Sequence, residues 1–266
     1  MNMEAVKEKL ARIGARVSVV IPAYNEAENL SHVLPKIPNW VYEVILVDDH
    51  STDGTADVAR QLFPTIRVVP TARGRGKGAA LQTGFAAATG EIIVTFDADG
   101  SSDPLEIPVF VAPLLDGADY SKGSRFVRGG GTSDMTWDRK AGNAVFVLMT
   151  RLLYGAHWTD LCYGYNAFWT WVAPVLGLDG DGFEIETMMN IRAIRNKLRI
   201  VEVPSFEADR IHGVSRLQTF PDGWRVLKTI WRERGTSVRP EAAQNGRRSM
   251  AALVDRNAAT AAPGSE

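Results

Sequence analysis

The sequence predicts an α/β fold built on a doubly wound, mostly parallel sheet with helices on its faces. Two observations support this prediction. Short, almost continuously apolar runs, typical of strands covered on both sides, alternate with helical stretches. Polar segments that carry acidic residues follow three of these runs. Ligands of such sheets bind outside the carboxyl ends of the strands, so the chemistry is expected in these segments.

Composition narrows the class of protein. Of 266 residues, 45% are hydrophobic and 23% are charged, which excludes disorder throughout. The net charge of -1 gives no electrostatic basis for binding nucleic acid. The single cysteine, Cys162, cannot form an internal disulfide, and residues 1–16 lack the apolar core of a signal peptide. The sequence contains no run of 18 apolar residues, the length needed to span a bilayer, so we expect a cytoplasmic protein.

The first half of the chain alternates strands and helices. Residues 1–16 form an amphipathic segment in which Val6, Leu10 and Ile13 recur at helical spacing. Strands are predicted at 17–21, 43–47, 66–69 and 91–96, and helices near 27–35, 54–62, 77–88 and 105–115.

The second half is less regular. Its predicted elements are helices at 137–154, 183–197 and roughly 221–233, and a strand at 199–203. From Ser237 the chain is polar and rich in alanine without apolar periodicity, which predicts a disordered tail over 237–266. We therefore expect one domain, residues 17–236, between the N-terminal segment and this tail.

Asp97-Ala98-Asp99, after the fourth predicted strand, is the sharpest motif. Two carboxylates one residue apart at a strand end can hold one divalent cation, Mg²⁺ or Mn²⁺. Diphosphate oxygens and water would fill its other positions, and the ion would neutralise charge on a leaving nucleoside diphosphate. The alternative interpretation is an Asp-rich turn that ends the strand.

Gly74–Gly78 resembles a phosphate-binding loop but fits no standard pattern. Lys77 is not followed by Ser or Thr, as the Walker motif requires, and the segment follows the third strand instead of the first. A basic loop that opens a helix still suits an anionic ligand, while a solvated loop is the alternative. Taken alone, the isolated Arg125, Arg139 and Arg210 are more typical of surface residues.

A basic amphipathic helix is predicted near the end of the domain. Its apolar residues Phe220, Trp224, Leu227 and Trp231 recur at helical spacing. The segment from residue 192 to 240 contains eleven Lys+Arg and five Asp+Glu. Such a face can lie in a membrane interface or pack on the domain, and the sequence leaves both open.

Together these motifs resemble glycosyltransferase family 2, whose GT-A fold is a Rossmann-like, mostly parallel sheet flanked by helices. Within the family the chain is most similar to the polyprenyl-phosphate hexosyltransferases, such as dolichyl-phosphate mannose synthase. The resemblance runs from Val17 to about Glu233. The segments that carry it are VVIPAYNEAENL, ILVDDHSTDGT, GKGAALQTGFAAATG, FDADGSSDP, GSRFVRGG, TDLCYGYNAFW, GFEIE and EVPSFEADRIHGVSRL.

The resemblance implies a role for each matching residue. Asp97 and Asp99 would hold Mg²⁺ or Mn²⁺, and catalysis would depend on them together with Arg210. The lipid phosphate of the acceptor would be bound by Arg139, Asn143 and Arg210. The donor, GDP-mannose or UDP-glucose, would contact the loops after the strands; the residues concerned are Pro22, Tyr24, Glu26, Asp48, Asp49, Lys77, Asp97, Ala98 and Arg125.

The implied reaction is inverting transfer of a hexose, mannose or glucose, from a nucleoside diphosphate to a polyprenyl phosphate. A phosphomonoester, with a second pKa of about 6, is largely a dianion at neutral pH and needs no base. A hydroxyl acceptor would need one, and the Glu-Asp pair of related enzymes that act on hydroxyls is missing from Phe183–Glu186. Without a spanning segment, the enzyme would meet its lipid peripherally at the inner face of the membrane, or through a membrane partner protein.

Three alternatives stay open. An enzyme of the same fold could glycosylate a soluble or saccharide hydroxyl with Glu184 or Glu186 as base. A sugar nucleotidyltransferase would carry a Gly-rich loop after its first strand, whereas Pro22–Glu26 contains no glycine. The third alternative is a non-catalytic protein that binds nucleotide sugars.

Overall fold

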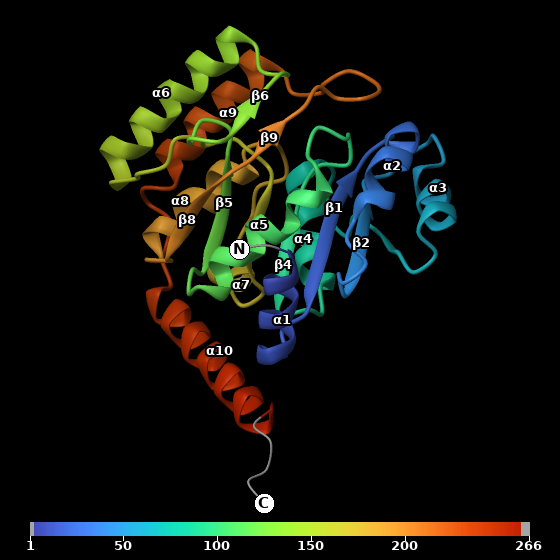
Figure 1. Cartoon of the computed structure of the whole chain (residues 1–266). Coiled ribbons are helices and arrows are strands. Elements are labelled where there is room, and N and C mark those ends of the chain that lie inside the picture. Colours follow the sequence, from blue (N-terminus) through green and yellow to red (C-terminus); the bar gives the residue numbers. More distant parts are fainter. Residues whose placement is uncertain (1–2, 262–266) are drawn as a thin grey trace, which may run out of the picture.

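The sheet confirms the predicted α/β class. In the computed structural model, which describes residues 3–261, seven strands form one sheet in the order β3-β2-β1-β4-β7-β5-β8 (Figure 1). β7 runs antiparallel to β4 and β5, and the remaining neighbours are parallel. The strands are β1 (Val17–Ala23), β2 (Glu43–Asp48), β3 (Arg67–Pro70), β4 (Ile92–Thr95), β5 (Tyr120–Ser124), β7 (Asn166–Trp169) and β8 (Ile200–Pro204).

Helices flank the sheet, and a separate two-stranded pair, β6 (Gly131–Thr132) with β9 (Phe206–Glu207), lies beside it. The α-helices are α1 (Met3–Ile13), α2 (Ala27–Val33), α3 (Thr55–Leu62), α4 (Lys77–Ala87), α5 (Ile107–Leu115), α6 (Trp137–Tyr154), α7 (Val172–Leu176), α8 (Ile185–Arg195), α9 (Thr219–Arg232) and α10 (Pro240–Ala261). The predicted strands and helices all lie within a few residues of observed ones, whereas β5, β7, the small pair, α7 and α10 were not predicted.

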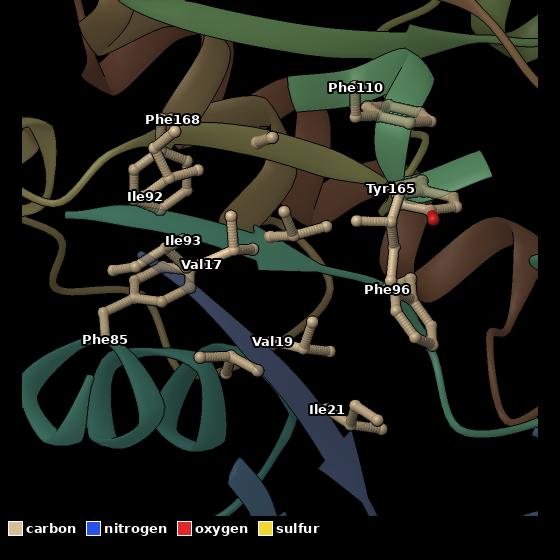
Figure 2. Close-up of a cluster of buried hydrophobic side chains, with 14 of the residues drawn as sticks. Val17, Val19, Ile21, Phe85, Ile92, Ile93, Phe96, Phe110, Tyr165 and Phe168 are labelled. Atoms are coloured by element: carbon tan, nitrogen blue, oxygen red, sulfur yellow. The ribbon is translucent and has the colours of Figure 1, made fainter. Parts of the chain in front are cut away.

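The core explains why the central strands are apolar on both faces. In β1, residues 17–21 are all buried, and Figure 2 shows three of these side chains beside those of β4. Phe85 of α4 meets Phe168 of β7 edge to face, with ring centroids 5.1 Å apart. Phe110 of α5 stacks on Tyr165 at 3.9 Å, directly before β7. Helices from the first half of the chain thus pack against residues of the second half in one core, as a single domain requires.

The C-terminal segment differs from the prediction. The disordered tail predicted over 237–266 is wrong for residues 240–261, which form α10; residues 262–266 lie outside the described part of the chain, as do residues 1 and 2. Ala243 is fully buried, and Arg247 forms an ion pair with Asp119 at 2.7 Å. Asn257 donates a hydrogen bond to the carbonyl of Ile13 in α1. Alanine-rich sequence favours helix, and these contacts supply the packing that its own periodicity does not predict.

α9 also resolves an open question. It packs beside α6 through a face that includes Val226 and Ile230, not through the predicted aromatic face (Figure 1). Phe220, Trp224 and Trp231 are 88%, 60% and 63% exposed. Within residues 3–261, no helix is long and apolar enough to cross a membrane.

Candidate active site

A cavity of about 550 Å³ opens at the carboxyl ends of β1, β2 and β4. It gathers every predicted site residue except Asp48, whose carboxylate accepts the N–H of Ser51 instead. The predicted residues that line it are Pro22, Tyr24, Glu26, Asp49, Lys77, Asp97, Ala98, Asp99, Arg125, Arg139, Asn143 and Arg210.

The loops after β1 and β2 are bonded to each other. Asn25, with a φ of 53°, donates its N–H to the hydroxyl of Ser51 and accepts the N–H of Thr52 on its side chain. The N–H of Glu26 donates to the hydroxyl of Thr55. These cross-links fix the wall of the cavity that Glu26 lines.

Asp49 offers an unused acceptor. One of its carboxylate oxygens accepts the N–H of Gly76 at 2.7 Å, and the other is buried with no hydrogen-bond partner in the described part of the chain. Buried polar atoms without partners are rare in native proteins, and a ligand is one source of the missing hydrogen bond. Asp49 could therefore accept an N–H group of a nucleobase.

The glycines of the basic loop serve close packing. A Cβ on Gly76, whose φ is 109°, would lie 2.5 Å from the carbonyl oxygen of Asp181, and one on Gly78 would lie 2.2 Å from that of Gly180. The N–H of Gly78 donates to Asp181. The basic loop is thus held against residues 180–182. This packing places Lys77 in the cavity.

Lys77 joins two carboxylates. Its Nζ lies 2.7 Å from Asp97 Oδ1 and 2.6 Å from Glu186 Oε1. Burial alone would lower the pKa of Lys77, but the charges of Asp97 and Glu186 outweigh it and raise the pKa above its ordinary value. Lys77 therefore stays protonated, and Glu186 is its counter-ion.

Arg210 forms the corresponding bridge on the other side of the acidic pair. Its guanidinium lies 2.9 Å from Asp99 Oδ2 and 2.9 Å from Glu26 Oε1. Ser101 donates both its N–H and its hydroxyl to Asp99 Oδ1. Ser101 thus orients Asp99.

Arg125 lines the cavity but is held by protein carboxylates. It is bidentate to the fully buried Asp160, with distances of 2.7 and 2.9 Å, and forms an ion pair with Glu207. Its visible role is to join the end of β5 to the segment before β7, through Asp160, and to β9, through Glu207. Its contact with a donor phosphate stays a prediction.

α6 lines one side of the cavity. Asn143 is buried, donates to the carbonyl of Thr159 and accepts the N–H of Leu161, so its amide fixes this segment. Arg139 is more exposed and donates to the carbonyl of Leu217. Of these two residues only Arg139 carries a positive charge. Its contact with an acceptor phosphate stays a prediction.

The acidic pair fits a hard divalent cation. Within the described residues, no group of three or more His, Cys, Asp or Glu could hold a metal, so the protein would offer Asp97 and Asp99 alone. Oxygen ligands from diphosphate and water would complete such a site, as is common for Mg²⁺. If all six groups are written as ionised, Glu26, Asp97, Asp99 and Glu186 against Lys77 and Arg210 have a formal charge of -2, which a divalent cation would balance. Burial raises the pKa of Glu26 and of Glu186, and a bound cation would favour their ionised forms.

Sequence reasoning did not find two features of this site. Glu186 was considered only as a base, because no spacing pairs it with the distant Lys77. Gly164 was not singled out, yet a Cβ there would lie 2.7 Å from Lys77 Nζ and 3.2 Å from Asp97 Oδ2. A glycine between Tyr163 and Tyr165 carries no local signal of this close approach.

Comparison with known proteins identifies the family of this chain. Residues 18–170 match the sequence profile of Glycosyl transferase family 2. The chain belongs to this family. It is therefore a glycosyltransferase.

Curated relatives in this family act on polyprenyl phosphates by name. The chain is 34% identical over 215 residues to undecaprenyl-phosphate mannosyltransferase of Micrococcus luteus, covering 76% of this chain and 87% of the relative. It is 32% identical to polyprenol monophosphomannose synthase of Mycolicibacterium smegmatis, covering 76% and 81%. It is also 32% identical to dolichol-phosphate mannosyltransferase of Pyrococcus furiosus, where the match covers 76% of this chain but only 59% of the relative.

Solved structures show the same fold. Glucosyl-3-phosphoglycerate synthase from Mycobacterium tuberculosis, in complex with Mn²⁺, UDP and phosphoglyceric acid, superposes with a TM-score of 0.69. It is 25% identical, and the match covers 89% of this chain and 84% of that one. The glycosyltransferase therefore has the GT-A fold.

Proposed function

We propose that this glycosyltransferase transfers a hexose, mannose or glucose, from a nucleoside diphosphate to a polyprenyl phosphate with inversion at the anomeric carbon. The observation that carries the proposal is the acidic pair Asp97 and Asp99 at the base of the cavity, flanked by the cations Lys77 and Arg210. The names of the curated relatives support the acceptor and favour mannose.

The donor would be GDP-mannose or UDP-glucose. Asp49 would accept an N–H of the base, and Lys77 and Arg210 would contact the diphosphate. Mg²⁺ or Mn²⁺ held by Asp97 and Asp99 would neutralise charge on the leaving diphosphate. These side chains thus orient the donor with its leaving group toward the acidic pair.

A phosphate acceptor suits this cavity because no free base is needed. A phosphomonoester dianion is already nucleophilic at neutral pH. The one carboxylate on α8 that lines the cavity, Glu186, is occupied by Lys77 at 2.6 Å. Arg139 at the α6 side would hold the acceptor phosphate.

The acceptor lipid implies contact with a membrane surface. α6 and α9 present exposed apolar side chains beside cations such as Arg225 and Lys228, a combination that suits an anionic membrane interface. We propose that this face lies on the inner side of the membrane; its exposed apolar residues are Trp137, Val145, Leu148, Leu152, Phe220, Trp224 and Trp231.

Radiolabelled GDP-mannose and UDP-glucose, each incubated with Mg²⁺ and undecaprenyl phosphate, test the proposal. We expect labelled polyprenyl-phosphate hexose from one of the two donors. Parallel reactions with phosphoglyceric acid and with free saccharides test the acceptor. Transfer to these soluble acceptors without labelled lipid would contradict the assignment.

A second candidate acceptor is a soluble molecule, since phosphoglyceric acid occupies the complex of the Mycobacterium tuberculosis synthase. A hydroxyl acceptor would need Glu184 or Glu186 as base. Under this candidate, Glu186→Gln would abolish turnover while donor binding stays normal. Under the polyprenyl-phosphate proposal, the same substitution weakens donor binding, because Glu186 no longer holds Lys77 beside the cavity.

A further inference from the structure

Two cations each bridge one buried glutamate and one member of the acidic pair. Lys77 contacts both carboxylate oxygens of Asp97, at 2.7 and 2.8 Å, and also contacts Glu186. The Glu186 side chain is only 4% exposed, whereas that of Asp97 is 35% exposed. Lys77 is therefore anchored on its buried side and meets Asp97 on the side that faces the cavity.

Arg210 repeats the arrangement from another part of the chain. One of its terminal nitrogens contacts both oxygens of Glu26, and the other contacts Asp99 Oδ2. Since Ser101 occupies Asp99 Oδ1, the oxygen that Arg210 holds is the one left for a further ligand. Each cation thus competes with a metal ion for an aspartate oxygen.

We propose that Lys77 and Arg210 couple binding of the donor diphosphate to binding of the divalent cation, an inference that rests on the proposed function. Both side chains leave their aspartates for diphosphate oxygens when the donor binds, and Glu186 and Glu26 keep them beside the cavity. Only then are both aspartates open to a metal ion. Glu186 and Glu26 are positioning residues in this scheme, because they act through Lys77 and Arg210.

Charge supports this exchange. A cation beside a carboxylate opposes a divalent ion at the same oxygens by direct repulsion, and a diphosphate offers the displaced cation an equivalent anionic partner. Linkage then requires that nucleotide raises the affinity for metal by the same factor as metal raises the affinity for nucleotide.

Gly164 gives a way to disturb this contact without changing a charge. Its Cα faces the point where Lys77 meets Asp97 and Glu186. An added Cβ would lie 2.7 Å from Lys77 Nζ and 3.4 Å from Glu186 Oε1. Gly164→Ala would therefore push Lys77 away from Asp97. The coupling predicts that this substitution acts in the same direction as removal of the ammonium group.

Titration of Mn²⁺ followed by electron paramagnetic resonance, with no acceptor present, tests the coupling. In the wild type, UDP or GDP should raise the affinity for Mn²⁺ by a factor of roughly 5 to 150, the usual range of coupling between sites. Lys77→Met should bind Mn²⁺ alone more tightly than the wild type and respond less to nucleotide. Gly164→Ala should shift both quantities in the same direction.

Two further variants control for folding and for charge. Lys77→Met leaves the buried carboxylate of Glu186 without its cation, which can destabilise the fold. The double variant Lys77→Met/Glu186→Gln removes this problem, and it keeps the formal charge of the cluster at -2. The double variant should also bind Mn²⁺ alone more tightly, because Asp97 is released. Glu28→Gln removes a charge from an exposed side chain of α2 and should behave as the wild type.

The outcomes separate this inference from the function. Unchanged or weaker binding of Mn²⁺ alone by both Lys77→Met and the double variant would overturn the coupling, as would equal Mn²⁺ affinity with and without nucleotide. Intact coupling without transfer to polyprenyl phosphate would uphold it and refute only the acceptor. A wild type that binds neither nucleotide would refute the donor assignment and the coupling together.

Discussion

Asp99 is the best-supported metal ligand at the scale of single residues. Its Oδ1 is fixed by two hydrogen bonds from Ser101 at 3.0 and 2.7 Å, so the direction of Oδ2 into the cavity is set. Among residues 3–261, the carboxylate of Asp97 is held by Lys77 alone. A fixed carboxylate costs less reorganisation when it binds an ion, which is why Asp99 should be the more sensitive of the two.

Asp99→Ala should lower the rate of sugar transfer at least about 100-fold, because metal stabilisation of a leaving group contributes several kcal/mol. The protein should still fold, because Arg210 keeps its ion pair with Glu26 when Asp99 is removed. Initial rates with labelled donor and calorimetric unfolding measure the two effects. Asp209→Ala, an exposed neighbour outside the cavity, is the control. A near-native rate in Asp99→Ala would refute its role as ligand.

Glu43 predicts a pH-dependent contribution to stability. Burial opposes its ionisation, but hydrogen bonds from Ser18, Thr89 and Arg67 outweigh burial and lower its pKa from 4.5 to about 2. The stabilisation is therefore complete above pH 4.5 and lost as the pH falls toward 2.

Glu43→Gln should lower the free energy of unfolding at pH 7 by about 1.5–3 kcal/mol, the usual range for hydrogen bonds to a charged group. The difference from the wild type should shrink between pH 4.5 and pH 2. Urea denaturation at several pH values measures it. A difference that stays constant over this range would contradict the lowered pKa.

At the scale of elements, prediction from sequence succeeded where periodicity is set by burial. β1, β2 and β4 are apolar because both faces are covered, and α1 buries the Val6, Leu10 and Ile13 stripe that the sequence shows. β5 failed because its sequence, Tyr120-Ser-Lys-Gly-Ser124, is polar although every residue in it is buried. Lys122 is tolerated there because Glu202 of β8 lies 3.7 Å away, a distant partner that local sequence does not reveal.

The site shows the same limit. The polar residues after β1, β2 and β4 were predictable because parallel strands bring their carboxyl ends to one edge. Arg125, Arg139, Asn143 and Arg210 followed only from the family resemblance. Which cation holds which carboxylate was not predictable, since Lys77 and Glu186 meet only through the fold. α10 was missed for a related reason: its buried side chain, Ala243, is too small to mark an apolar stripe.

The exposed aromatic face of α9 predicts binding to anionic vesicles. Trp224→Ala/Trp231→Ala should weaken binding to phosphatidylglycerol vesicles about tenfold or more, since each buried aromatic contributes on the order of 1.5–3 kcal/mol. Co-sedimentation measures it. Tyr42→Ala removes an exposed aromatic from another face and serves as control. Equal binding by both variants would exclude this face.

Docking of α10 predicts a local effect on stability. Ala243→Asp places an unpaired carboxylate in a fully buried position and should release α10, so that limited proteolysis between residues 240 and 257 becomes several-fold faster. Ala252→Asp changes an exposed position of the same helix and should leave the cleavage rate unchanged. Equal rates in the two variants would show that Ala243 does not dock the helix.

At the scale of the whole molecule, the sheet, the cavity and the exposed helix face suit different parts of one reaction. The strand ends supply the acidic pair, the start of α4 supplies Lys77 and the segment after β9 supplies Arg210, which together form the proposed diphosphate site. α6 lines the cavity and also carries exposed apolar side chains. An enzyme arranged in this way can take its donor from water and its acceptor from a lipid surface.

Metal dependence of sugar transfer is the most direct test of this account. Transfer from labelled nucleotide sugar to polyprenyl phosphate should stop in excess EDTA and return when Mg²⁺ or Mn²⁺ is added back beyond the chelator. Transfer that continues unchanged in EDTA would contradict the assigned role of Asp97 and Asp99.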